Sequence, residues 1–158
     1  MDDSIYVKAR EAAVKHIGIS VYSSGSIRDF LLRKDFPYEV VVSVVKELVE
    51  RKYIDDNKAC HKILYQRTGK KQESKDFMLK RLLAGGVDEY VAEDYIYALP
   101  ADSVTILSLF DAVISDGDDL DSPEVRESLC DWSRKRGYSF ECFAEAYREW
   151  ISTHNDSQ

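Results

Sequence analysis

The side chains that most often carry catalysis or bind metals are few in this 158-residue chain, and their spacing forms no familiar site. None of the three histidines, at positions 16, 61 and 154, stands with a cysteine or carboxylate at the spacing of zinc ligands. Cys60 and His61 are adjacent, and adjacent residues on a helix point apart. No glycine-rich phosphate loop and no Gly-x-Ser-x-Gly elbow occurs. We therefore expect a protein that is not an enzyme and that has no metal, cofactor or small-molecule substrate.

The acidic stretch at 116–121, followed by Glu127, has a faint likeness to a calcium-binding loop. Leu120 stands at one ligand position, Asp121 stands where the loop needs glycine, and Pro123 interrupts it. We interpret the stretch as an exposed connection before a helix.

Charge is distributed unevenly along the chain, whose net charge is −7. Residues 58–81 carry 8 basic and 2 acidic residues, whereas residues 82–158 carry 5 basic and 17 acidic residues. The overall balance argues against sequence-blind nucleic-acid binding by the whole molecule. The basic segment is either a solvated helix face or a contact surface for an acidic partner.

The three cysteines lie far apart in the sequence, at positions 60, 130 and 142, so a disulfide framework is not expected. This pattern predicts a reducing, cytoplasmic location. The acidic N-terminus lacks a signal-peptide core, and no apolar run is long enough to span a membrane.

The elements that must position these residues follow a repeat of 51 residues. One column of the alignment holds Phe36, Val87 and Tyr138. Apolar residues follow each member of this column at the spacing of an amphipathic helix stripe. The same offset also aligns an earlier helix, in which the members of one column are Ile27, Met78 and Leu129. We expect the closing column to be buried in every repeat: Leu48, Leu99 and Trp150.

Boundary signals agree with this repeat. Ser74 and Ser122 can cap helix starts, and Pro123 then occupies a favourable first helical position. Asp88 and Ser139 are further candidate caps. Turns that end the second helix of each repeat are expected at Lys34-Asp35, Gly85-Gly86 and Gly137.

The pattern predicts an all-α protein, an elongated array of three tandem three-helix repeats spanning 1–54, 55–100 and 101–158. The expected helices are 4–20, 24–34, 37–53, 55–69, 74–85, 88–99, 101–115, 122–136 and 139–152. The β-branched run at 40–45 favours a strand by propensity alone, but its equivalents in the other repeats are typical of helix. A DNA-binding helix–turn–helix at 24–48 is also open, although its second helix has no basic residue before Lys46.

The segment "VVSVVKELVERKYIDDNKACHKILYQRTGK" resembles the RecX family, which regulates the RecA recombinase. The residues that carry the resemblance at this junction are Leu48, Lys52, Tyr53, Ile54, Asp55, Asp56 and Cys60. Further matches are Arg67, Ser74, Leu82 and Gly86-Val87. The turn in "RKRGYSFECFAEAY" is also similar, so the resemblance covers nearly the whole chain.

The resemblance implies a regulator that binds the RecA filament on single-stranded DNA and limits its extension and activity in recombination and DNA repair. We assign the contact surface to the basic segment, with Arg67, Lys70, Lys71, Lys75, Lys80 and Arg81. Two equivalent patches are Arg134-Lys135-Arg136 and Arg33-Lys34. Cations at helix C-termini also favour the helix dipole, so a purely structural role stays open.

Two other functions remain open. The basic segment of a small DNA-binding protein would contact DNA directly, with an affinity that falls steeply with salt. A helical adaptor would bind another protein through its acidic third repeat.

Overall fold

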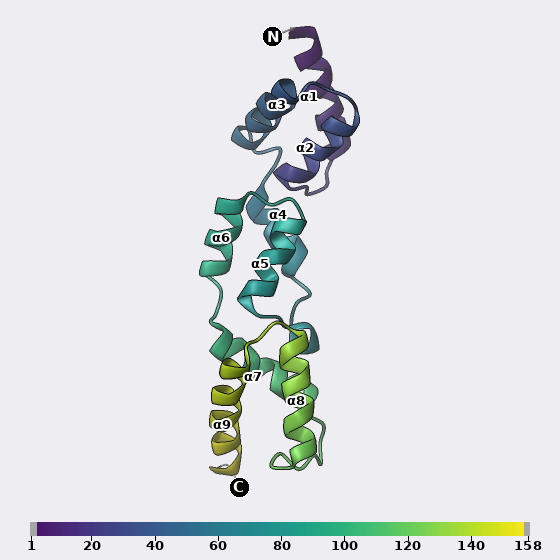
Figure 1. Ribbon diagram of the computed structural model, residues 1–158. Coiled ribbons are helices and arrows are strands. Elements are labelled where there is room, and N and C mark those ends of the chain that lie inside the picture. Colours follow the sequence, from purple (N-terminus) through teal and green to yellow (C-terminus); the bar gives the residue numbers. More distant parts are fainter. Residues whose placement is uncertain (1–2, 157–158) are drawn as a thin grey trace. The chain divides into compact units, whose positions relative to one another are not determined.

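The computed structural model describes residues 3–156, which form nine α-helices, one 3₁₀ helix and no strand (Figure 1). The all-α fold class is therefore confirmed. The helices are α1 (Asp3–Ile17), α2 (Ser24–Arg33), α3 (Tyr38–Glu50), α4 (Asp56–Leu64), η1 (Gly69–Lys71), α5 (Lys75–Ala84), α6 (Glu89–Tyr97), α7 (Asp102–Val113), α8 (Pro123–Lys135) and α9 (Phe140–Asp156). No single helix in this range is long and apolar enough to cross a membrane, and one pair, α6 with α7, passes that test only when both helices are counted together.

The chain divides into two compact units. Unit 1 comprises the residues up to Leu64 together with Lys80–Tyr97, and unit 2 comprises Tyr65–Leu79 together with the residues from Ala98 onward. Units are defined by contacts in space, whereas the repeats at 1–54, 55–100 and 101–158 are defined by equivalence in sequence. The three-repeat division therefore stays a prediction.

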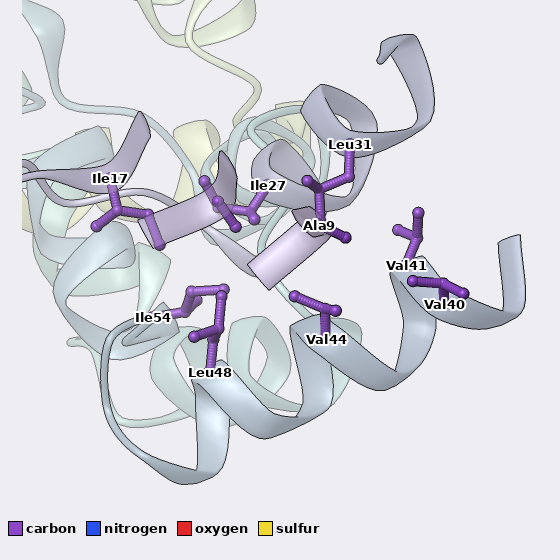
Figure 2. Close-up of a cluster of buried hydrophobic side chains, with 10 residues drawn as sticks. Ala9, Ile17, Ile27, Leu31, Val40, Val41, Val44, Leu48 and Ile54 are labelled. Atoms are coloured by element: carbon purple, nitrogen blue, oxygen red, sulfur yellow. The ribbon is translucent and has the colours of Figure 1, made fainter. Parts of the chain in front are cut away.

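One buried cluster of unit 1 is built mainly by α1, α2 and α3. In Figure 2 the side chains of Val44 and Leu48 point from α3 toward those of α1 and α2. Ala9 on α1 is fully buried, and its small side chain lets the helices approach closely. The valine-rich segment 40–45 is thus helical, because its buried positions follow the helical period.

The core of unit 2 is aromatic. The Phe110 ring of α7 meets Phe143 and Trp150 of α9 edge-on, with centroids 5.8 and 5.6 Å apart. The indole N–H of Trp150 donates a hydrogen bond to Asp111 at 3.0 Å. Leu129 brings α8 onto the same cluster. Large rings fill this core where aliphatic side chains fill that of unit 1.

Three turns follow the second helices at the expected period. Asp35, Gly86 and Gly137 have φ angles of 65°, 83° and 90°. At each turn, the amide of the following residue donates to a carbonyl five positions earlier, as in a Schellman motif. Glycine suits this left-handed conformation, and Asp35 adopts it at some cost.

The predicted caps are confirmed. The hydroxyl groups of Ser74 and Ser122 accept from amides three residues ahead, and Pro123 follows Ser122 as the first residue of α8. Asp88 and Ser139 cap α6 and α9 in the same way.

Several predicted helix bounds differ from the structure. The helices expected at 4–20 and 37–53 end earlier, at Ile17 and Glu50. The helix expected at 55–69 ends at Leu64, and the positive φ of Gly69, 60°, then begins the separate turn η1. The last helix continues to Asp156 instead of ending at 152. Leu99 lies beyond the end of α6 and is only partly buried, because the proline that follows it disfavours helical backbone. Its repeat equivalents, Leu48 and Trp150, are buried as expected.

Candidate partner-binding surface

Seven of the eleven predicted cations lie toward the C-terminal ends of the second helices, which we call the basic helix ends. Arg33 lies in the last turn of α2, and Lys34 is its C-cap. Arg134 and Lys135 lie in the last turn of α8, and Arg136 is its C-cap. In repeat two, Lys80 and Arg81 lie near the end of α5. Cations are favoured at this end of a helix by the backbone dipole, so their place alone does not require a partner.

A cation contacts an aromatic ring at the same place in repeats one and three. The Lys34 ammonium lies 5.7 Å from the centroid of the Phe30 ring, and the Arg136 guanidinium lies 5.4 Å from that of Trp132. The two pairs are separated by two repeat periods. Such contacts hold the cation in one position and so reduce the entropy lost when it binds an anion.

The Phe30 ring belongs to a longer column in unit 1. His16 stacks on Phe30 at 3.9 Å and on Tyr22 at 5.0 Å, and the Lys62 ammonium lies 5.7 Å from the Tyr22 centroid. Lys34 and Lys62 therefore lie at opposite ends of three stacked rings. The column combines residues from α1, the following loop and α2, so no period in the sequence predicts it.

An exposed aromatic residue begins the third helix of repeats one and three. Tyr38 is 66% exposed and Phe140 is 64% exposed, and these positions are equivalent in the repeat. Tyr90, one position later in repeat two, is 79% exposed. Exposed aromatic residues beside cations are typical of interface anchors. The 51-residue period aligns Tyr38 with Phe140 across two repeats, so the sequence does contain a signal for this exposed position.

The basic segment is divided between the two units. Lys70 and Lys71 lie on η1 and are exposed, and Arg67 lies before η1 and is partly buried. These three residues and Lys75 belong to unit 2, whereas Lys80 and Arg81 belong to unit 1. The cations of the basic segment therefore do not all lie in one patch of either unit.

In unit 2 the structure brings Lys75 close to the basic end of α8. The amide of Ser74 donates to the carbonyl oxygen of Arg136 at 3.0 Å. In unit 1 the basic end of α2 stays apart from the turn after α5. Gly25, at the opposite end of α2 from Lys34, donates to Gly86 at 2.8 Å. At 1.5 Å per residue, about 14 Å separates Gly25 from Lys34 along the helix.

The turns at Gly86 and Gly137 are held against the preceding repeat by equivalent contacts. The Ser23 hydroxyl donates to the carbonyl of Gly85 at 2.6 Å, and Ser74 makes its contact to Arg136 across the same span of 62 residues. A Cβ on Gly86 would lie 2.6 Å from the Ser23 hydroxyl, and a Cβ on Gly137 would lie 2.6 Å from the Ser74 hydroxyl. Glycine is needed at both turns because atoms of the preceding repeat leave no room for a Cβ.

The Asp-Asp pair of the family resemblance has a structural role. Asp56 accepts hydrogen bonds from the Ser24 amide at 2.7 Å, the Ser24 hydroxyl at 2.6 Å and the Asp88 amide at 2.9 Å. Asp55 caps its own helix. Asp102, the first residue of α7, accepts from the Lys75 amide at 2.8 Å. A carboxylate at the start of the first helix thus caps the second helix of the preceding repeat.

The basic end of α8 shares its surface with carboxylates. Three acidic residues of α8 line a cavity of about 590 Å³ together with Trp132, Lys135 and Arg136. Arg134, whose side chain is 71% exposed, lies 3.8 Å from Asp131. An exposed pair of this kind contributes little to stability.

Two buried side chains, the Cys60 thiol and the Tyr138 phenol, are not suited to act as nucleophiles at neutral pH. Burial raises the pKa of the Cys60 thiol to about 11 and that of the Tyr138 phenol to about 12, so both stay protonated. Within residues 3–156, no three His, Cys, Asp or Glu side chains are grouped to hold a metal ion.

No protein-family model matches the chain. The regulatory protein RecX of Bacillus velezensis is 23% identical over 153 residues, and that of Streptococcus mutans is 20% identical over 149 residues. Each alignment covers 94% of this chain, which spans 57% of the length of either relative.

Two crystal structures share the fold. RecX from Lactobacillus salivarius superposes with a TM-score of 0.74 at 14% identity, covering 95% of this chain and 99% of the other. A second regulatory protein RecX gives a TM-score of 0.63 at 16% identity, covering 90% and 72%. The resemblance to the RecX family that the sequence predicts is therefore confirmed, by relatives of that name in sequence and by RecX crystal structures in fold.

Proposed function

We propose that this protein is a RecX-type regulator that binds the RecA filament on single-stranded DNA and limits its extension and activity in recombination and DNA repair. The observation that carries the proposal is a likeness to regulatory proteins named RecX along 94% of the chain. The family resemblance seen in the sequence includes the junction at Asp55-Asp56, and Asp56 joins successive repeats by accepting from the Ser24 amide.

We further propose that the basic helix ends contact the filament. Their support is the recurrence of one arrangement, a cation held on an aromatic ring, at equivalent places in repeats one and three. An exposed aromatic residue follows each of these two turns, at Tyr38 and Phe140. Fixed cations suit carboxylates and phosphates, and exposed aromatic rings supply contact area at low entropic cost.

Direct DNA contact is a minor part of this proposal. The net charge of −7 repels the phosphate backbone at long range. A filament presents protein surface together with phosphate, so a few cations at fixed positions are sufficient for binding to it. We expect binding to naked single strands to be weak and to fall steeply with salt.

Co-sedimentation with RecA filaments on single-stranded DNA tests the proposal, with naked DNA as the parallel control. The variants carry Arg33→Glu with Lys34→Glu, or Arg134→Glu with Lys135→Glu. A matched variant carries Lys8→Glu with Arg148→Glu, two exposed cations away from the basic helix ends. We expect each test variant to bind filaments at least about tenfold more weakly and the matched variant to be nearly unaffected.

The outcomes separate the parts of the proposal. Equal affinity of the test and matched variants would remove the basic helix ends from the interface. Absence of filament binding by the wild-type protein would contradict the proposal that it is a RecX-type regulator. Tight binding to naked DNA alone would favour a DNA-binding protein.

A further inference from the structure

The outward side of α6, which we call the α6 face, has a chemistry opposite to that of the basic helix ends. Four exposed residues stand there at the helical spacing i, i+3, i+4 and i+7: Tyr90, Glu93, Asp94 and Tyr97. The two tyrosines are 79% and 87% exposed. On the other side of the helix Ala92 and Ile96 are buried, so this face is not needed for the core of unit 1.

The carboxylates of the α6 face have no partner in the part of the chain that the structure describes. No salt bridge or side-chain hydrogen bond among residues 3–156 engages Glu93 or Asp94. The helix itself carries no cation, and the sequence has no Lys, Arg or His between Arg81 and Arg126. The negative charge of the face is therefore not balanced on its own helix.

These carboxylates do not help α6 to form. Glu89 and Glu93 are like charges four residues apart, and Asp94 lies in the last turn, where the backbone dipole favours cations. Helices α2, α5 and α8 all have a basic residue in that turn. A helix of nine residues has little stability of its own. Helix stability therefore does not explain why the face is acidic.

The repeat does not explain the α6 face either. A cation stands at the position of Tyr97 in both other repeats, as Lys46 and Arg148. Neither of the other repeats has an aromatic residue at the position of Tyr90. The combination of exposed tyrosines and carboxylates is thus specific to repeat two and is not a requirement of the shared fold.

The chemistry of the α6 face suits a cationic partner. Carboxylates accept the paired N–H groups of arginine, and tyrosine rings bind guanidinium and ammonium groups over their faces. The same carboxylates repel phosphate, which excludes nucleic acid and anionic lipid surfaces. A metal ion is not suited either, because no three His, Cys, Asp or Glu side chains within residues 3–156 are grouped to hold one.

We propose that the α6 face binds an arginine- and lysine-rich segment of a protein partner. Tyr90 and Tyr97 are about 10 Å apart along the helix, so the face has room for several cationic side chains. The inference goes beyond the proposed function, because it gives the protein a second surface whose charge is opposite to that of the basic helix ends. The test below uses a probe that does not depend on RecA.

The probe is a labelled helical peptide of about 15 residues with arginines and lysines along one face. Its matched control carries glutamine in place of every cation. Binding is followed by anisotropy at physiological ionic strength, and the contact is mapped from the backbone amide resonances of the protein. We expect saturable binding of the cationic peptide, with shifts at Tyr90, Glu93 and Asp94, and at least about tenfold weaker binding of the neutral peptide.

Two pairs of variants test the face itself. Glu93→Gln with Asp94→Asn should weaken peptide binding at least about tenfold, because both carboxylates are removed. The matched variant, Glu141→Gln with Glu145→Gln, removes two exposed carboxylates of α9 and should bind as the wild type does. Tyr90→Ser should weaken binding about threefold, whereas Tyr90→Phe retains the ring and should keep the affinity.

The α6 face is ruled out as the binding surface if the cationic peptide shows no saturable binding, or if the two double variants bind it equally. Filament binding is measured on the same proteins. Its absence in the wild type, with peptide binding intact, would count against the proposed function and support the α6 face. Filament binding without peptide binding would overturn the α6 face alone.

Discussion

The two junctions between successive repeats have the same topology and different chemistry. At the first junction, the start of α2 meets α4 and the turn at Gly86; at the second, the start of α5 meets α7 and the turn at Gly137. A serine packs on a glycine 63 residues later in both cases. Both junctions need a glycine at the turn, because a Cβ there would clash with the serine.

The differences lie in what surrounds that contact. The first junction depends on one carboxylate, Asp56, with three donors, and on direct backbone approach between Gly25 and Gly86. The second adds a buried phenol, because the Tyr138 hydroxyl bonds Thr105 at 2.7 Å and donates to the Glu73 carbonyl at 3.1 Å. One repeat plan therefore tolerates different side-chain solutions, provided that the turn and the cap are kept.

The largest expected effect is at the glycine of the first junction. A Cβ on Gly86 would lie 2.8 Å from the backbone nitrogen of Ser26, which cannot move without displacing α2. We expect Gly86→Ala to lower the free energy of unfolding by about 3 kcal/mol or more in urea denaturation. Gly137→Ala should cost about 2 kcal/mol, because its main obstacle is the Phe77 ring, a side chain that can turn.

Gly117 is the control for these two variants. Its φ angle is 88°, and no atom lies within 4 Å of a Cβ built there. Gly117→Ala should therefore cost only the conformational strain, about 1 kcal/mol. An equal cost at all three glycines would show that close approach does not matter at the junctions.

The next effect concerns the two capping carboxylates. Asp56→Ala leaves the amides of Ser24 and Asp88 without their acceptor and should cost about 2 kcal/mol. Asp102→Ala removes one amide contact and should cost about 1 kcal/mol. Urea denaturation of both variants measures the difference, and a larger cost at Asp102 would reverse the comparison.

Tyr138 should make the second junction sensitive to alkali. Tyr138→Phe removes two hydrogen bonds and should cost about 1 kcal/mol at neutral pH. Burial raises the pKa of Tyr138 to about 12, above an unfolded value of about 10. Its stabilising contribution is therefore complete below pH 10 and is lost as the pH rises toward 12. The stability difference between wild type and Tyr138→Phe should shrink over that interval, and a constant difference would contradict this role.

The smallest effect is an acid response in unit 1. The Tyr6 hydroxyl bonds Glu47 at 2.9 Å and Arg10 bonds it at 3.0 Å, and these contacts lower the pKa of Glu47. Its contribution is present above the unfolded pKa, about 4.3, and is lost as the pH falls below it. The gap in urea midpoint between wild type and Glu47→Gln should therefore close from pH 6 to pH 3. A gap that persists at pH 3 would exclude Glu47 as the titrating group.

Much of the fold could be predicted because the repeat gives each signal three times. A single glycine pair is a weak sign of a turn, but Gly86 and Gly137 at one period identify the same left-handed position. Helix limits were less predictable where one local residue decides them. Leu99 follows the repeat pattern but precedes a proline, which ends the helical segment early.

The candidate sites were predictable only in part. The place of the basic helix ends could be predicted, because the charges and the 51-residue period can both be read directly from the sequence. The column of His16, Tyr22 and Phe30 could not, since it depends on how α1 and α2 pack.

The most direct test of the central claim is the rate of RecA filament extension on single-stranded DNA, followed in real time with and without this protein. A RecX-type regulator should slow extension, and the variant with Arg33, Lys34, Arg134 and Lys135 all changed to glutamate should have lost most of that effect. Extension that continues at an unchanged rate in the presence of excess wild-type protein would contradict the account.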